Sequence, residues 1–271
     1  MLETNSGWRR FWERGDWWRA LILAAVYYAL YELFVWAVAA FVGTTVPADG
    51  GAGDLLLRTG VPILLGVCAL IAFAASLGWL PELFTRQAVS ARRWMWIAVV
   101  VVLAVNVSSV LSIDYNKAGA ALTGAWLLTG LCIGAAEEIL TRGFVVNMMR
   151  KAGRRETSVA LTSAGIFAAL HIGNVFTSDQ SIATTASQVV YTFAFGICMY
   201  LALRVTRTIW GPILLHASTD PTLSLHGAYP ESNLFGVLSA SSTILIVISG
   251  ATLAAVLFVS ERRAARALAS T

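Results

Sequence analysis

Residues 134–147 read GAAEEILTRGFVVN, and they place two carboxylates and a guanidinium inside a segment that is otherwise apolar enough to span a membrane. A charged side chain at the centre of a bilayer costs about 2.5 to 3.5 kcal/mol even on the mildest insertion scales. Glu137, Glu138 and Arg142 must therefore be compensated by one another or by other buried polar groups. Charged residues in such positions usually mark a functional site.

Helical spacing separates the two carboxylates. Glu138 and Arg142 are four residues apart, which places their side chains on one helical face and predicts an ion pair. Glu137 is turned about 100° away, since a helix has roughly 3.6 residues per turn, and its carboxylate stays outside that pair. Its own face continues through Gly134 and Gly130, and this row of small residues predicts a closely packed neighbouring helix. A buried pair that only fixes helix register is the alternative interpretation of Glu138 and Arg142.

The composition is that of a membrane protein. The 271 residues are 58% hydrophobic and 13% charged, with a mean hydropathy of +0.72, far from the usual range of a soluble domain. A helical crossing needs roughly 20 residues, so eight crossings would use nearly the whole length, and we expect one membrane-embedded domain, residues 1–271. The basic residues are dispersed between apolar segments, which argues against nucleic-acid binding.

The apolar segments predict an all-α polytopic bundle of about eight transmembrane helices. Of the 19 basic residues, 16 fall on one side of this arrangement, Arg58 and Lys117 fall on the other, and Arg142 lies within a helix. The positive-inside rule then predicts a multi-pass protein of the cell membrane with both termini in the cytoplasm. The predicted spans cover residues 18–42, 60–80, 94–112, 119–149, 157–174, 184–203, 209–222 and 234–259.

Two longer outer loops are expected between these spans, at residues 44–58 and 172–183. A further acidic residue, Glu32, lies in the middle of the first span. We expect Glu32 to make a structural polar contact, either by pairing with a residue such as Asn106 or by lining the same cavity as Glu137.

Two of the three histidines, His171 and His216, lie in apolar segments. At about 1.5 Å per residue, Glu137 and His171 each lie roughly 20 Å from the basic turn at residues 150–156, so they can meet. His216 reaches a similar depth if its span is tilted or kinked, and Asp220, four residues on, can hydrogen-bond its imidazole and fix the tautomer. We expect these residues to form a joint site. His226, by contrast, is expected to be solvated in an outer loop.

Three motifs in order carry a family resemblance: Glu-Glu-x-x-x-Arg at residues 137–142, Phe-x-x-x-His at residues 167–171, and His-x-x-x-Asp at residues 216–220. The chain resembles the CPBP family of intramembrane proteases, which includes the CAAX proteases and the bacteriocin-processing (Abi, Rce1-like) proteins. The resemblance covers about residues 120–222 and implies a four-helix catalytic core there. Asp220 stands where many members have Asn.

The resemblance implies that the protein is a glutamate-dependent endopeptidase which hydrolyses a peptide bond within the membrane. Glu137 would be the general base that takes a proton from water, and His171 would position and polarise that water. His216, oriented by Asp220, would donate a hydrogen bond to the oxyanion of the tetrahedral intermediate. Glu138 and Arg142 would hold the helix and tune Glu137. The implied substrate is a membrane-associated protein or peptide.

Other interpretations stay open at this point. Glu137, His171 and His216 are also a legitimate catalytic zinc set with an open fourth position, although no HExxH motif is present and no cofactor is assigned. A non-catalytic membrane protein of bacteriocin-immunity or scaffold type could retain the same core. Buried carboxylates and histidines also build proton relays in transporters, but the sequence contains no inverted repeat that would support this alternative.

Overall fold

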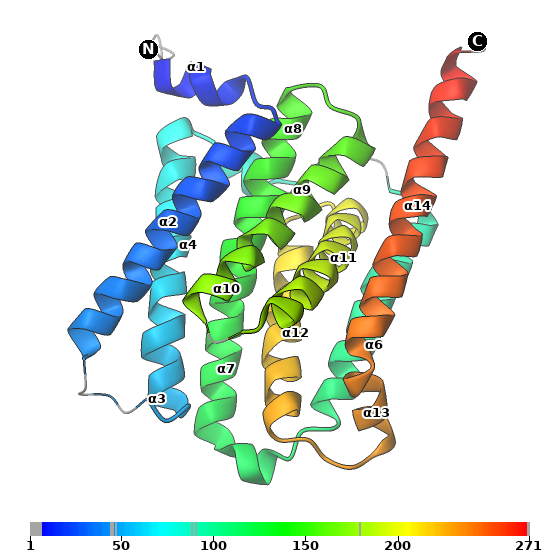
Figure 1. Ribbon diagram of the computed structural model, residues 1–271. Coiled ribbons are helices and arrows are strands. Elements are labelled where there is room, and N and C mark those ends of the chain that lie inside the picture. Colours follow the sequence, from blue (N-terminus) through cyan, green and yellow to red (C-terminus); the bar gives the residue numbers. More distant parts are fainter. Residues whose placement is uncertain are drawn as a thin grey trace.

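The computed structural model describes residues 7–43, 46, 48–87, 89, 91–178 and 180–269 (Figure 1). Over these residues the chain is helical, and its one β-type pairing is the isolated bridge between Ile113 and Pro230. Seven helical segments of this described part are long and apolar enough to cross a membrane. The predicted all-α polytopic bundle is confirmed.

Long helices form the crossings, and short helices lie next to the ends of the crossings. Their bounds are α1 (Gly7–Glu13), α2 (Trp17–Val42), α3 (Ala52–Asp54), α4 (Val61–Leu77), α5 (Leu80–Phe84), α6 (Trp96–Val110), α7 (Tyr115–Glu138), α8 (Val146–Lys151), α9 (Glu156–Leu170), α10 (Asn174–Thr177), α11 (Ile182–Thr206), α12 (Trp210–Ala228), α13 (Leu234–Ala240) and α14 (Ser242–Ala269). Two π-helical segments, η1 (Leu55–Gly60) and η3 (Ile139–Val145), and two 3-10 turns, η2 (Arg93–Met95) and η4 (His171–Gly173), join some of these helices.

Seven of the eight predicted spans coincide with the seven membrane-length helical segments. The predicted span at 209–222 corresponds to α12, which packs against α7, α6 and α11 inside the bundle. It is not among the seven because His216, Asp220 and His226 make it less apolar than the other crossings. Both described ends of the chain lie at the same end of the bundle, as an even number of crossings requires (Figure 1).

The two segments predicted as outer loops are partly helical, which hydropathy did not indicate. The segment 44–58 becomes helical at Ala52, and the segment 172–183 begins with η4 and α10. The eighth predicted span is two helices, α13 and α14, which are separated at Ser241. The expectation for His226 was wrong, because α12 continues past it and its Nδ1 lies 2.9 Å from Ser112 Oγ.

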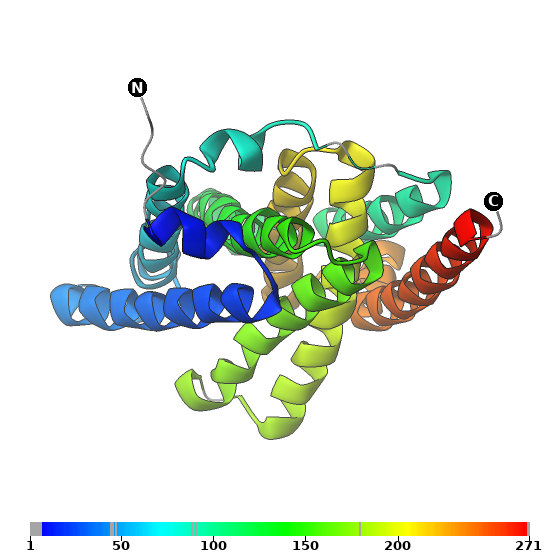
Figure 2. The ribbon, with the colours of Figure 1, turned by 90° about the horizontal axis from the view of Figure 1, so that it is seen from above.

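The helix α11 lies at the centre of the bundle. Within its most apolar 18-residue stretch 67% of the residues are buried, whereas the corresponding share is 17% in α2 and 28% in α14. The helices α2 and α14 lie on opposite sides of the bundle in both views (Figures 1 and 2). The inner helices α7, α9, α11 and α12 pack on one another between them. All the residues of the three sequence motifs therefore lie on the inner helices or at their ends.

Ion pairs attach α1 and the start of α2 to the end of α8 and the basic turn that follows it. Lys151 Nζ lies 2.6 Å from Glu13 Oε2, and the buried Trp79 indole donates to Glu13 Oε1 at 2.8 Å. Arg154 pairs with Asp16 at 2.6 Å, and its guanidinium holds the pKa of the Asp16 carboxyl below its ordinary value. These contacts hold α2 in place at one end, and α2 forms one wall of the site described next.

Candidate active site

The helices α7 and α12 approach each other closely along the glycine row that precedes Glu137. A Cβ atom at Gly130 would lie 2.2 Å from Pro221 Cγ, and one at Gly134 would lie 2.8 Å from the Ala217 backbone nitrogen. Contacts this short are possible only where no side chain intervenes. The predicted close packing is confirmed, and the neighbour is the helix that carries His216.

Glu137 and His216 lie side by side across this interface. The His216 Nε2 atom is 3.4 Å from Glu137 Oε2 and 3.5 Å from Asp220 Oδ2. The His216 side chain is only 2% exposed, whereas those of Glu137 and Asp220 are 24% and 34% exposed. The two carboxylates thus stand between the buried imidazole and the space outside it.

The second glutamate of the pair lies behind His216. The Glu138 side chain is fully buried, and its Oε1 atom is 3.0 Å from Arg142 Nη1, which confirms the predicted ion pair. The same oxygen is 2.8 Å from His216 Nδ1. Asp220 was predicted to orient the imidazole, but Glu138 is its closer partner and faces the opposite ring nitrogen. Spacing along one helix could not show a contact between α7 and α12.

Arg142 reaches further into the bundle than its partner. Its Nη2 atom donates to the Gly196 carbonyl of α11 at 2.8 Å, and its guanidinium lies 4.8 Å from the centre of the Phe167 ring. A Cβ at Gly196 would lie 3.0 Å from Ala164, so α9 and α11 also touch at this level. One buried cation thus connects three of the inner helices.

The helix that carries the motif changes from α to π at Ile139, directly after Glu138. All residues of η3 are buried, and the Thr141 hydroxyl donates to the Glu137 carbonyl at 2.5 Å. A π-helical turn adds a residue to the turn and re-aims the side chains on either side of it, and such turns recur at functional sites. A regular helix was expected here, and the π-helical turn was not predicted.

His171 begins the 3-10 turn η4 at the end of α9. Its Nδ1 atom lies 3.0 Å from the Phe167 carbonyl, and because a carbonyl can only accept, Nδ1 carries the hydrogen. In the neutral ring this leaves the Nε2 lone pair available. The Phe167 ring packs edge-on against His171 and His216, with centroids 5.1 and 5.7 Å away. Phe167 thus separates and orients the two imidazoles.

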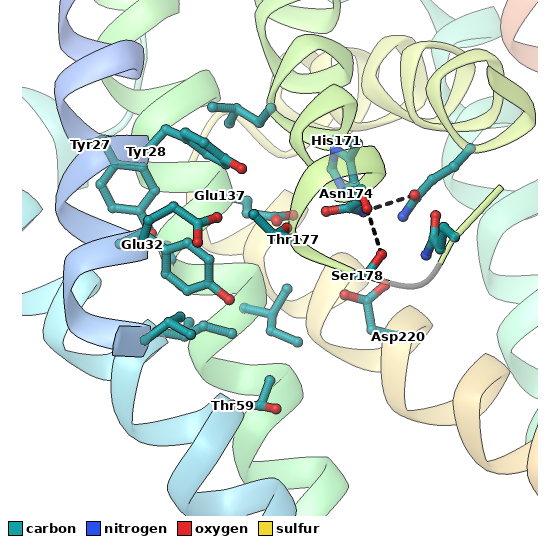
Figure 3. A pocket seen from close by; sticks show the side chains of 18 of the residues that line it. Tyr27, Tyr28, Glu32, Thr59, Glu137, His171, Asn174, Thr177, Ser178 and Asp220 are labelled. Atoms are coloured by element: carbon teal, nitrogen blue, oxygen red, sulfur yellow. Dashed lines mark hydrogen bonds between the residues drawn. The ribbon is translucent and has the colours of Figure 1, made fainter. Parts of the chain in front are cut away.

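A cavity of about 680 Å³ joins these elements. Glu137, His171 and Asp220 line it from α7, η4 and α12, and Figure 3 shows Glu137 between the side chains of α2 and those of the other two elements. Three of the six predicted site residues therefore share one cavity. The other three, Glu138, Arg142 and His216, are buried behind its wall.

The α2 side of the cavity was not predicted as part of the site. Tyr27, Tyr28 and Tyr31 line it together with Glu32, which fits the second of the two roles considered for Glu32. Asn106 instead donates to Ser218 and Thr219 of α12. The sequence feature that could have predicted this wall is the set of polar residues one helical turn apart in the first span. Other lining residues that were not predicted are Trp126, Asn174, Thr177, Ser178, Gln180 and Gln188.

The zinc alternative can be compared with the arrangement of the donor side chains. Within the described ranges, no group of three or more His, Cys, Asp and Glu side chains is arranged so that it could hold a metal ion. His216 Nδ1 faces Glu138 and its Nε2 faces two carboxylates.

The fold and site define a polytopic membrane protein in which Glu137, His171 and Asp220 line one cavity and His216 is buried directly behind its wall. Residues 119–222, from within α7 to within α12, match the family described as Type II CAAX prenyl endopeptidase Rce1-like. This match confirms the predicted resemblance and supports endopeptidase activity within the membrane. No curated protein matches the chain.

Proposed function

We propose that the protein is an intramembrane endopeptidase in which Glu137 activates a water molecule to hydrolyse a peptide bond. The observation that carries this proposal is the 3.4 Å separation of Glu137 Oε2 from His216 Nε2, at the wall of the cavity that His171 also lines. A general base and hydrogen-bond donors beside the same cavity are what a hydrolytic reaction requires.

The Glu137 carboxylate takes a proton from the water, and the water oxygen attacks the carbonyl carbon of the substrate. His171 orients this water by accepting a hydrogen bond at Nε2. The carbonyl oxygen becomes an oxyanion, and the C–N bond breaks when Glu137 passes the proton to the leaving nitrogen. The products are a carboxylic acid and an amine, the acid then passes its proton to the amine through water, and Glu137 returns to its starting form.

His216 stabilises the oxyanion in this scheme by donating from Nε2. An ionised carboxylate only accepts hydrogen bonds, so these surroundings favour an imidazolium, with Nδ1–H toward Glu138 behind the ring and Nε2–H toward Glu137 and Asp220 in front of it. Arg142 compensates the Glu138 charge and keeps it in place beneath His216. Glu138 and Arg142 are therefore positioning residues, and Asp220 is a secondary partner of the ring.

We assign the substrate to membrane-associated proteins or peptides, because the cavity lies within a bundle of membrane-length helices. The mechanism needs no metal. The excess of basic residues on one side supports a multi-pass protein of the cell membrane with cytoplasmic termini.

Quantitative proteomics of membrane fractions tests the proposal even though the substrate is not identified. Cells that contain the wild-type protein are compared with cells that contain an equal amount of inserted Glu137→Ala protein. We expect new peptide ends that are present only with the wild type. Identical peptide ends in the two samples would contradict a protease and would favour the non-catalytic alternative.

A further inference from the structure

A second cavity, of about 730 Å³, lies at the end of the bundle where the described part of the chain begins and ends, and it shares no lining residue with the first. It is formed by the segment before α6, the start of α9, the end of α11 and the last turns of α14. The proposed peptidase mechanism uses none of these residues.

Five arginines from four parts of the chain line this cavity, against two glutamates. The arginines are Arg92, Arg155, Arg204, Arg262 and Arg266. Two of them, Arg262 and Arg266, are four residues apart in α14, a spacing at which like charges repel. Positive-inside topology accounts for arginines on this side of the bundle, but not for their convergence on one hollow from separate helices.

Both glutamates are already engaged with other groups. Glu156 pairs with Arg150 at 2.9 Å and with Arg204 at 3.1 Å, and it accepts from the Tyr200 hydroxyl. Glu261 accepts from the backbone and the hydroxyl of Thr157, at 3.0 and 2.7 Å. These contacts compensate Arg204 and the start of α9. The cavity as a whole keeps an excess of positive charge.

Part of the cavity lining is apolar and is exposed on the outside of the bundle. Leu161 and Phe258 line it and are 43% and 42% exposed. The Arg262 guanidinium lies over the Phe258 ring at 4.1 Å, so cationic and apolar groups adjoin directly. A ligand that fits both parts carries a negative head and a hydrocarbon body. A free phosphate would use only the first part.

We infer that this cavity binds the phosphate headgroup of an anionic phospholipid, with the acyl chains against Leu161 and Phe258. Arginine forms paired hydrogen bonds to phosphate oxygens, and basic pockets between helices at the cytoplasmic side of a membrane suit anionic headgroups. The bound lipid would connect α14 to the start of α9, the helix that leads to His171. This inference does not depend on the peptidase activity.

Native mass spectrometry of the purified full-length protein in detergent tests the site, with phosphatidylglycerol, phosphatidylcholine and glycerol phosphate as separate probes. We expect phosphatidylglycerol to be retained in preference to the other two. Arg155→Gln and Arg262→Gln should each weaken its binding by about fivefold. Arg263→Gln is the matched control, because Arg263 is exposed on the same helix and does not line the cavity.

Equal binding of phosphatidylglycerol and phosphatidylcholine would overturn the inference. It would also be overturned if Arg263→Gln weakened phosphatidylglycerol binding as much as Arg262→Gln, because the lipid would then respond only to diffuse surface charge. Binding of glycerol phosphate as tightly as phosphatidylglycerol would show a site for a soluble phosphate instead of a lipid. Because the Arg155 side chain is exposed, the Arg155→Gln variant should fold normally, and its thermal midpoint without lipid should match that of the wild type.

Discussion

Glu138 Oε1 lies 2.8 Å from His216 Nδ1, and both side chains are buried. The two adjacent glutamates of the motif therefore differ in their positions relative to one imidazole. Glu138 lies behind the ring and is compensated by Arg142, whereas Glu137 faces the other ring nitrogen and the cavity. This division is the basis of the roles proposed for them.

Replacement of Glu138 should reduce turnover more than replacement of Asp220. In Glu138→Gln the group that orients His216 loses its charge, and we expect kcat to fall by about 100- to 1000-fold, the usual cost of a misplaced oxyanion donor. Asp220→Asn keeps a hydrogen-bonding side chain at the same place, and we expect a fall of less than about tenfold. Steady-state kinetics on both variants would refute the assignment if Asp220→Asn proved the more damaging change.

Removal of Arg142 should destabilise the whole bundle. The variant Arg142→Met leaves the fully buried Glu138 carboxylate without its counter-charge, and we expect the free energy of unfolding to fall by about 3 to 5 kcal/mol. The double variant Glu138→Leu/Arg142→Met should recover part of this loss, because neither charge is then buried alone. Denaturation in detergent measures both changes. A double variant less stable than Arg142→Met would show that the pair is not the source of the effect.

The glycine row of α7 should be intolerant of even one methyl group. In Gly130→Ala the new Cβ would lie 2.2 Å from Pro221 Cγ, so α12 must shift, and its His216 must shift with it. We expect a loss of activity of about 100-fold, the typical effect of a displacement of about 1 Å at a reacting centre. Gly124→Ala is the matched control on the same helix, because nothing lies within 4 Å of its Cβ position. Similar activities of the two variants would contradict the importance of this contact.

Chelators should leave the activity unchanged. The proposed reaction runs through Glu137 and the two histidines, and none of its steps uses a metal ion. Metal analysis of the purified active protein should find less than one zinc ion per chain. Activity that is lost on chelation and restored by zinc would replace this mechanism with one in which a metal activates the water.

Contacts within one helix and the similar depth of Glu137, His171 and His216 were predictable from the sequence, but the individual side-chain contacts between helices were not. The Glu138 and Arg142 pair and the packing face of Gly130 and Gly134 follow from helical periodicity, and both are present. The contact between Glu138 and His216 depends on the rotation of α12 against α7, which no spacing encodes. For this reason the sequence predicted that Asp220, four residues from His216, orients the imidazole, and the contact of Glu138 with the ring was not predicted.

Hydropathy likewise located the crossings but not their irregularities. It does not distinguish an α-helix from the π-helical turns of η1 and η3, since the same sequence has the same hydropathy in either form. It also placed His226 in a loop, because α12 continues beyond its apolar part and hydropathy does not detect the polar part. The contact between His226 and Ser112 holds this last part of the helix in place. The tyrosines of α2 line the cavity only because α2 lies against the inner helices, which is a property of the tertiary structure.

The role of Glu137 is tested most directly by the rate of peptide cleavage by purified Glu137→Gln protein, measured beside Glu32→Gln. Both variants neutralise a carboxylate that lines the same cavity, so they differ only in position. We predict that Glu137→Gln loses at least about 100-fold in kcat with its fold intact, whereas Glu32→Gln stays within about tenfold of the wild type. Wild-type turnover by Glu137→Gln would contradict its assignment as the base.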